Sequence, residues 1–272
     1  MKLCKYWDVA ETAAPDATGK TMRLRKWGGS NTSAEDAKRA AKQALDDLVR
    51  RVASASFKRD DYSYSMRDVP EELVQEISGT AGVTRNGKGC LVLNTADAVF
   101  ADIDISGPGF FAKLFGATRE KEEQKYIAKL KEFLVRYPDA GARIYRTKAG
   151  LRYLFTHAPH PVSDETIGWL RELGSDKLYV QLCRNQKCYR ARLTPKPFRI
   201  GCGRITGHYP FASPALQDGF RRWLEMYTRN SQSYAVCEFI SAEGNSRVHP
   251  DIAPLVKIHD SATRIGEPLP LA

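Results

Sequence analysis

The chain has 272 residues, of which 42% are hydrophobic and 10% aromatic, and this composition excludes a largely disordered protein. At this length a hydrophobic core can form without disulfides or a structural metal. Lys and Arg outnumber Asp and Glu by 42 to 32, a formal charge of +10 that favours polyanionic partners. The first residues lack a secretory h-region and no apolar run could cross a bilayer, so we expect a cytoplasmic protein without a membrane partner, with reduced cysteines.

The first elements in chain order are two strands and a helix. Strands are expected at residues 3–9 and 21–27 on either side of a turn. Thr32 or Ser33 can cap a helix whose apolar residues recur at helical spacing as far as Val52. This is the clearest amphipathic helix in the sequence.

The next elements are a short helix and a three-stranded meander. Pro70 fits the first turn of a helix over residues 68–79. The Asn86-Gly87 pair favours a tight turn between the first two strands. The meander is expected at residues 83–85, 89–93 and 99–105.

From the last meander strand onward, the elements follow the order β-α-β-β-α-β, which is that of a ferredoxin-like (RRM-like or palm-like) α+β core. The predicted elements are a strand at 99–105, a helix at 118–137, a hairpin of 143–147 and 151–156, a helix at 163–174 and a strand at 178–183. We expect a further strand at 188–193 to pair with the last of these. A helix at 213–228 and a strand at 234–239 should complete the fold.

The predicted elements divide the chain into three parts. Residues 1–58 form an N-terminal module, and residues 59–212 form the ferredoxin-like core with a basic hairpin. Residues 213–272 should pack on that core as a C-terminal helix and strand.

Asp102 and Asp104 are the strongest candidates for chemistry. Alternation along their strand places both carboxylates, with Phe100, on the sheet face opposite the two helices, which we expect to be free. Paired carboxylates of this kind bind Mg²⁺ or Mn²⁺ together with substrate phosphates, so both residues are predicted as metal ligands and catalytic residues.

Arg152 is predicted to reach the same sheet face from the hairpin. Its guanidinium could hold a phosphate beside a bound metal, which would make it a third catalytic residue. Alternatively, it could replace the metal by pairing with Asp102 or Asp104. Both interpretations stay open at the level of sequence.

A basic segment without acids follows the core. Residues 177–217 contain eight Lys or Arg and no Asp or Glu, interleaved with aromatic residues, a pattern typical of nucleic-acid binding. The predicted contacts are Arg184, Lys187, Tyr189, Arg190, Arg192, Lys196, Arg199 and Arg204.

Zinc is a less favoured cofactor. Cys183, Cys188, Cys202 and His208 would have to meet in space, and their spacing is wider than in structural zinc fingers. Buried thiols with no metal are the more common role for such cysteines.

Nearly the whole chain resembles a widespread bacterial protein family that has no established activity. The resemblance rests on five phrases, at residues 83–86, 91–95, 178–184, 190–197 and 259–263. It therefore implies no particular reaction.

Two further motifs resemble those of archaeo-eukaryotic primase-polymerases. The first is residues 99–104, with Asp-x-Asp on a strand, and the second is the Thr-x-x-Gly hairpin that begins at Thr147. The resemblance implies a palm with an RRM-like sheet, in which the two aspartates bind metal. Arg152 stands where the family has a phosphate-contacting histidine, and Asp176 is a candidate for the third motif.

These observations favour a nucleic-acid-binding or nucleotide-binding protein with a primase-polymerase-like palm, in an intact or a degenerate form. The alternative is a Mg²⁺- or Mn²⁺-dependent enzyme acting on nucleotides or phosphodiesters through Asp102 and Asp104. A non-enzymatic protein-interaction module is a further alternative. The sequence does not choose between DNA and RNA, and it leaves the oligomeric state open.

Overall fold

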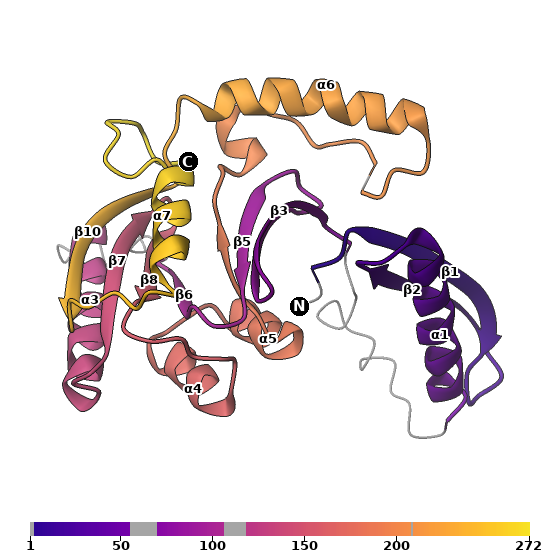
Figure 1. The fold of residues 1–272 in the computed structure, drawn as a ribbon, viewed down its shortest axis with the longest axis horizontal. Coiled ribbons are helices and arrows are strands. Elements are labelled where there is room, and N and C mark those ends of the chain that lie inside the picture. The colour runs from indigo at the N-terminus through magenta and orange to yellow at the C-terminus, as the bar shows by residue number, and fades with distance from the viewer. Residues whose placement is uncertain (1–2, 55–69, 106–117, 208) are drawn as a thin grey trace.

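A computed structural model describes residues 3–54, 70–105, 118–207 and 209–272. Over these residues the chain forms six α-helices and three antiparallel sheets (Figure 1), so the predicted α+β class is confirmed. No helix among them is long and apolar enough to span a membrane. The boundary predicted near residue 58 lies outside the described residues.

The N-terminal hairpin and helix lie at one end of the molecule (Figure 1). Strands β1 (Tyr6–Pro15) and β2 (Thr21–Ser30) pair in one long hairpin, on which α1 (Ala34–Val52) packs. Ser33 caps the helix by accepting a hydrogen bond from the Asp36 amide, as the sequence predicts. Leu24, Leu45, Leu48 and Val52 are among the buried residues that join the hairpin to the helix.

The central sheet has the strand order β3-β4-β5-β9. Its strands are β3 (Glu72–Ser78), β4 (Ala81–Arg85), β5 (Leu91–Thr95) and β9 (Tyr189–Arg192). The predicted hairpin of β4 and β5 is confirmed, but the tight turn at Asn86-Gly87 is wrong, because residues 86–90 separate the paired Arg85 and Leu91. The Asn86 side chain accepts from the Lys88 and Cys90 amides within this longer loop. The helix predicted over 68–79 is wrong for its described part, because the backbone there pairs with β4.

A second four-stranded sheet has the order β10-β7-β8-β6. Its strands are β6 (Phe100–Asp104), β7 (Gly141–Thr147), β8 (Gly150–Phe155) and β10 (Cys237–Gly244), and α3 (Arg119–Arg136) connects β6 to β7. The predicted pairing of the aspartate strand with the hairpin is confirmed, and Asp102 lies opposite Arg152. The predicted meander is wrong at its third strand, because β6 belongs to this second sheet and does not pair with β5.

The last strand of the predicted ferredoxin-like order is a helix. Residues 178–183 lie within α5 (Lys177–Gln186), where Asp176 caps the first turn and Val180 and Cys183 face the core. The strand that follows pairs with β5 of the central sheet rather than with these residues. The fourth strand of the second sheet is β10, from the C-terminal part of the chain, which joins the edge beside β7.

Helices cover both faces of the second sheet. On one face, α3 and α4 (Asp164–Glu172) pack through Phe133 and Trp169 against Phe155. On the other, α7 (Ala253–Ala262) lies across β7 and β8 (Figure 1), and its fully buried His259 contacts Phe100 and Tyr145. The face that carries Asp102 was predicted to be free, and this prediction is wrong because α7 covers it.

Helix α6 (Pro214–Ser231) holds the loop that follows β9. The Tyr227 hydroxyl contacts the Thr194 hydroxyl at 2.8 Å and donates to the Pro195 carbonyl at 2.6 Å. The loop continues into a short 3₁₀-helix, η3 (Pro197–Ile200). These contacts fix the direction of the chain over residues 193–200, which contain two of the predicted basic contacts, Lys196 and Arg199.

Gly150 allows β8 to approach β6 beside Asp104. A Cβ atom at this position would lie 2.0 Å from the Ile103 carbonyl oxygen. We therefore expect Gly150→Ala to lower the free energy of unfolding by about 2–4 kcal/mol, measured by urea denaturation. Gly168, in α4, has open space around it. Gly168→Ala is the control and should stabilise the protein by up to about 1 kcal/mol, and equal losses for both variants would contradict the prediction.

Candidate functional site

Arg152 and Asp102 form a two-pronged ion pair between the neighbouring strands β8 and β6. The Arg152 Nε donates to Asp102 Oδ1 at 2.7 Å, and Nη2 donates to Oδ2 at 3.1 Å. The Arg152 side chain is 1% exposed and that of Asp102 is 32% exposed. Burial alone disfavours the charged form, but the Asp102 carboxylate raises the pKa of Arg152 above its ordinary value. Arg152 is therefore a fixed cation.

The remaining nitrogen of Arg152 extends the network to α7. Its Nη1 donates to the Arg192 carbonyl at 3.0 Å and lies 3.3 Å from His259 Nε2. Because arginine only donates, His259 Nε2 must accept, so the ring proton is on Nδ1 and is donated to Asp260 Oδ1 at 3.0 Å. Burial lowers the pKa of His259, which favours this neutral form.

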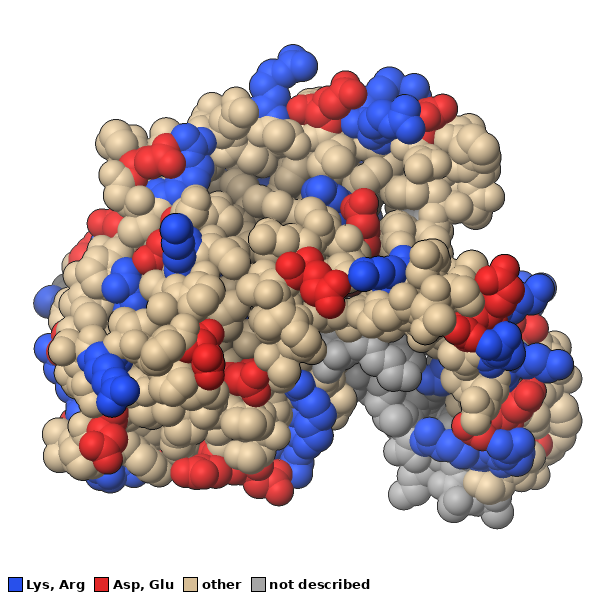
Figure 2. All heavy atoms as spheres, in the orientation of Figure 1, with Lys and Arg blue, Asp and Glu red and all other residues tan. Residues whose placement is uncertain are grey.

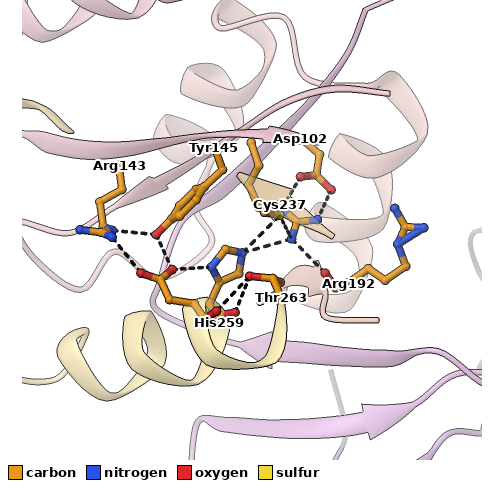
Figure 3. Close-up of polar contacts among 9 residues, drawn as sticks. Asp102, Arg143, Tyr145, Arg192, Cys237, His259 and Thr263 are labelled. Carbon is orange, nitrogen blue, oxygen red and sulfur yellow. Dashed lines mark hydrogen bonds and ion pairs between the residues drawn. The ribbon is translucent and has the colours of Figure 1, made fainter. Parts of the chain in front are cut away.

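Asp260 is held from its other side by the second strand of the sheet. The Tyr145 hydroxyl donates to Oδ1 and Arg143 Nη2 donates to Oδ2, both at 2.8 Å. Figure 3 shows the resulting polar chain from Arg143 through Tyr145 and His259 toward Asp102. Arg152, on β8, is thus held by Asp102 of β6 and His259 of α7, and β7 supports α7 through Tyr145.

Cys237, His259 and Asp260 have the order of a nucleophile triad. The Cys237 Sγ lies 4.0 Å from His259 Nε2. However, Cys237 is 1% exposed and His259 is fully buried, and Arg152 already donates toward the nitrogen that a general base would use. Burial also raises the pKa of the thiol to about 11. The three residues are a structural network that a substrate cannot reach.

Arg192, Lys196 and Arg199 form a second group, which we call the cation cluster. Arg192 ends β9, Lys196 follows the bend at Pro195, and Arg199 lies in η3. All three side chains are half-buried. The backbone carbonyl of Arg192 accepts the hydrogen bond from Arg152, which links the cluster to the buried ion pair.

The members of the cation cluster lie close enough to affect one another's ionisation. Burial lowers the pKa of Arg192, and the charges of Arg152 and Arg199 lower it further. Burial also lowers the pKa of Lys196, with added contributions from Arg192 and Arg199. Like charges held together in this way repel each other, and an anion would relieve that repulsion.

Two arginine nitrogens in the cluster are buried without a partner. Arg192 Nη1 and Arg199 Nη1 have no hydrogen-bond partner among the described residues, although neither atom is accessible to solvent. A buried donor that is left unsatisfied costs about 1–3 kcal/mol, and more when it is charged. Both donors are therefore left unsatisfied in this conformation.

The cation cluster lies beside the predicted metal ligands. Burial lowers the pKa of Lys196 and Arg199, and the exposed Asp104 carboxylate partly opposes this effect. The Asp102 carboxylate likewise opposes the lowering of the Arg192 pKa. The structure thus brings together two groups that the sequence places about 90 residues apart. No local signal joins the two groups, because β6 and β9 belong to different sheets and Lys196 and Arg199 lie beyond the end of β9.

The other predicted basic contacts lie elsewhere or have partners. Arg184 is exposed and pairs with Asp164 at 3.1 Å, and Arg190 pairs with Glu71 at 2.7 Å. Lys187 and Arg204 are exposed. Tyr189 was predicted to stack on bases, and this is wrong because its ring is fully buried and its hydroxyl contacts the Thr166 hydroxyl at 2.8 Å.

The acids and thiols near Asp102 and Asp104 do not complete a metal site among the described residues. The carboxylate of Asp176 caps α5, although its amide donates to the Asp102 carbonyl at 3.1 Å. In residues 3–54, 70–105, 118–207 and 209–272 no group of three or more His, Cys, Asp or Glu could hold a metal ion. Cys183, Cys188 and Cys202 are buried free thiols, and His208 lies outside these ranges.

The excess of positive charge is not gathered into one patch on the face that Figure 2 shows. Basic and acidic side chains alternate there in small groups over the outer helices and strands.

Comparisons of the chain with protein-family models, curated proteins and solved structures gave no match.

Proposed function

We propose that this protein binds the phosphate groups of a nucleotide or nucleic acid, and that Arg192, Lys196 and Arg199 contact them. The observation on which this depends is the pair of buried arginine nitrogens that have no partner among the described residues. Phosphate oxygens are strong acceptors, and arginine is the residue best suited to bind them in two-pronged geometry. A phosphate that reached these donors would supply the acceptors that they lack and would reduce the repulsion within the cluster.

An exposed aromatic ring supports a nucleic-acid or nucleotide ligand over a simple anion. Phe198 is 74% exposed, although it lies between two members of the cation cluster in the chain. The Arg199 guanidinium lies 5.8 Å from the centre of its ring. A base can stack on such a ring while its phosphate contacts the neighbouring cations, a combination that binds single strands with little sequence preference.

The resemblance to a primase-polymerase palm is part of this proposal. Elements β6, α3, β7 and β8 follow the β-α-β-β part of the palm order, and Asp102 and Asp104 lie on the first strand. A degenerate palm is the form favoured, because Arg152 already occupies both oxygens of Asp102. In that form the sheet positions phosphate-binding residues and performs no reaction.

A Mg²⁺- or Mn²⁺-dependent enzyme is the second candidate function, and the position of Asp104 favours it. This carboxylate is exposed and acts electrostatically on Lys196 and Arg199, so a metal bound there would also meet the phosphates of a ligand on the cluster. Metal binding at Asp102 would first require that its bond with Arg152 opens.

The proposal is tested by measuring how salt affects binding of fluorescent oligonucleotides. Single-stranded and duplex DNA, RNA and ATP would be titrated at two or more salt concentrations. We expect the single strand to bind most tightly. Arg192→Gln combined with Arg199→Gln should weaken its binding at least about tenfold and reduce the salt slope by about 1–2, because two phosphate contacts are lost.

Arg184→Gln combined with Lys187→Gln is the matched control. It removes the same charge from the same acid-free segment, but from α5 and its C-cap rather than from the cluster. We expect this variant to bind nearly as well as the native chain. Equal weakening by both pairs would mean that net charge alone matters, and absence of binding at low salt would refute the proposal.

A further inference from the structure

Two histidines beyond the end of β8 face each other through the same ring nitrogen. His160 Nε2 lies 2.8 Å from His157 Nε2, and the two ring centres are 4.7 Å apart. Pro159 stands between them in the chain and restricts the backbone of the loop. The His160 amide also donates to the Asp97 carbonyl at 2.7 Å, which ties the loop to the segment before β6.

Aromatic rings and two carboxylates surround the pair. Trp169 packs edge-on against His160 at 5.0 Å, and Phe155 packs against His157 at 6.2 Å. Burial lowers the pKa of both histidines, and each also lies within electrostatic range of one carboxylate, Asp139 for His157 and Glu165 for His160. Neutral imidazoles next to carboxylates favour a bound cation.

The protons of the pair are not settled by the contacts that the rings make. Neutral rings can share the Nε2 contact only if one of them carries its proton there. His157 Nδ1 is buried and makes no hydrogen bond of ordinary geometry with a described residue, although the Gly141 carbonyl acts on this ring. With a cation between the two Nε2 atoms, both lone pairs are used and the His157 proton belongs on Nδ1, toward Gly141.

We propose that His157 and His160 bind a divalent transition metal such as Zn²⁺ through their Nε2 atoms. Zinc–nitrogen bonds of about 2.0–2.1 Å place two tetrahedral ligands about 3.3 Å apart, so the pair needs to open by only about 0.5 Å. No third protein ligand is in position among the described residues, so water completes the coordination. The open positions leave the metal accessible to a further ligand.

This site is separate from Asp102 and the cation cluster. His157 follows Arg152 by five residues along an extended chain, a separation of about 16 Å. Its nitrogen ligands prefer zinc, nickel or copper, whereas carboxylate oxygens prefer magnesium or manganese. The inference therefore does not depend on the proposed function, and either can fail without the other.

Calorimetric titration of the chelator-treated full chain with Zn²⁺ tests the proposal. We expect one ion per chain, and at least about tenfold weaker binding for His157→Gln and for His160→Gln, since each removes half of the protein ligands. His249→Gln is the matched control, because the His249 amide donates to the Thr156 carbonyl at 2.8 Å beside the pair, while its ring is not part of it. This variant should bind as the native chain does.

A spectroscopic measurement on the native chain avoids reliance on the variants. Electron paramagnetic resonance of the native chain with Cu²⁺ should show hyperfine coupling to two imidazole nitrogens. Each single variant should show coupling to one imidazole nitrogen. The melting temperature without metal checks that each variant still folds. Absence of Zn²⁺ binding would overturn the proposal. It would also be overturned if His157→Gln bound Zn²⁺ as tightly as the native chain, or if the copper signal indicated thiolate ligands.

Discussion

Arg152→Met should lower the free energy of unfolding by about 3–5 kcal/mol in urea denaturation. Methionine has a similar volume, so the loss comes from the polar contacts. The substitution leaves the Asp102 carboxylate, the Arg192 carbonyl and the His259 ring nitrogen without their shared donor. Because the Asp102 side chain is 32% exposed, water can replace part of the lost interaction, and the effect should lie near the lower end of the range.

The same substitution at an exposed ion pair is the control. Arg184 pairs with Asp164, and their side chains are 52% and 91% exposed. Arg184→Met should change stability by less than about 1 kcal/mol, because exposed pairs contribute little. A comparably small loss for Arg152→Met would mean that the buried pair does not hold the sheet together.

The double variant Arg152→Met with Asp102→Asn separates the pair from its surroundings. Each single change leaves one partner without its counterpart, whereas the double change removes both charges together. We expect the double variant to be more stable than the sum of the single losses predicts, by at least about 1 kcal/mol. Additive losses would show that Arg152 stabilises the fold through its contacts with β9 and α7 instead.

Elements with local signals could be predicted from the sequence. The helices capped by Ser33, Thr118, Ser163 and Ser213 all begin where the sequence predicts, because a capping side chain and the first turn lie within a few residues of each other. The hairpin of β7 and β8 is local for the same reason. Such signals do not depend on the rest of the chain.

Residues 178–183 show why a local pattern can fail. Leu178, Val180 and Leu182 alternate with other residues as in a strand, but Val180 and Cys183 also have helical spacing. The Asp176 side chain settles the choice by accepting from the Tyr179 amide at 2.9 Å. The Asp N-cap is a local signal for a helix, whereas the strand expected here follows from the ferredoxin-like order of the preceding elements.

The candidate site was predictable only in part. Alternation in two neighbouring strands placed Asp102 and Arg152 on one sheet face, and the structure pairs them. The contribution of α7 could not be predicted, since His259 meets Arg152 across 107 positions of sequence with no motif that joins them. The pairing of β9 with β5, which places the cation cluster, is also non-local.

Asp102 and Asp104 should respond differently when each is replaced by asparagine. Asp102→Asn removes the counter-charge of the buried Arg152 and should lower stability by about 3 kcal/mol. Asp104 is exposed, so Asp104→Asn should change stability by less than about 0.5 kcal/mol. Chemical denaturation of both variants without metal gives these values, and equal losses would contradict the assignment of Arg152 to Asp102.

Asp104→Asn should instead change ligand binding, and in opposite directions with and without metal. Without metal, the carboxylate repels a phosphate on Lys196 and Arg199, so its removal should tighten oligonucleotide binding several-fold. With Mg²⁺ or Mn²⁺, the sequence-based prediction is that the native chain binds a nucleoside triphosphate more tightly than without metal, because the ion joins Asp104 to the phosphates. Asp104→Asn should lose that gain. Titrations of both proteins with ATP, in the presence of either EDTA or Mn²⁺, measure the two effects. If metal leaves ATP binding by the native chain unchanged, the metal-dependent enzyme interpretation is wrong. Phosphate binding by the cation cluster would not be affected by that result.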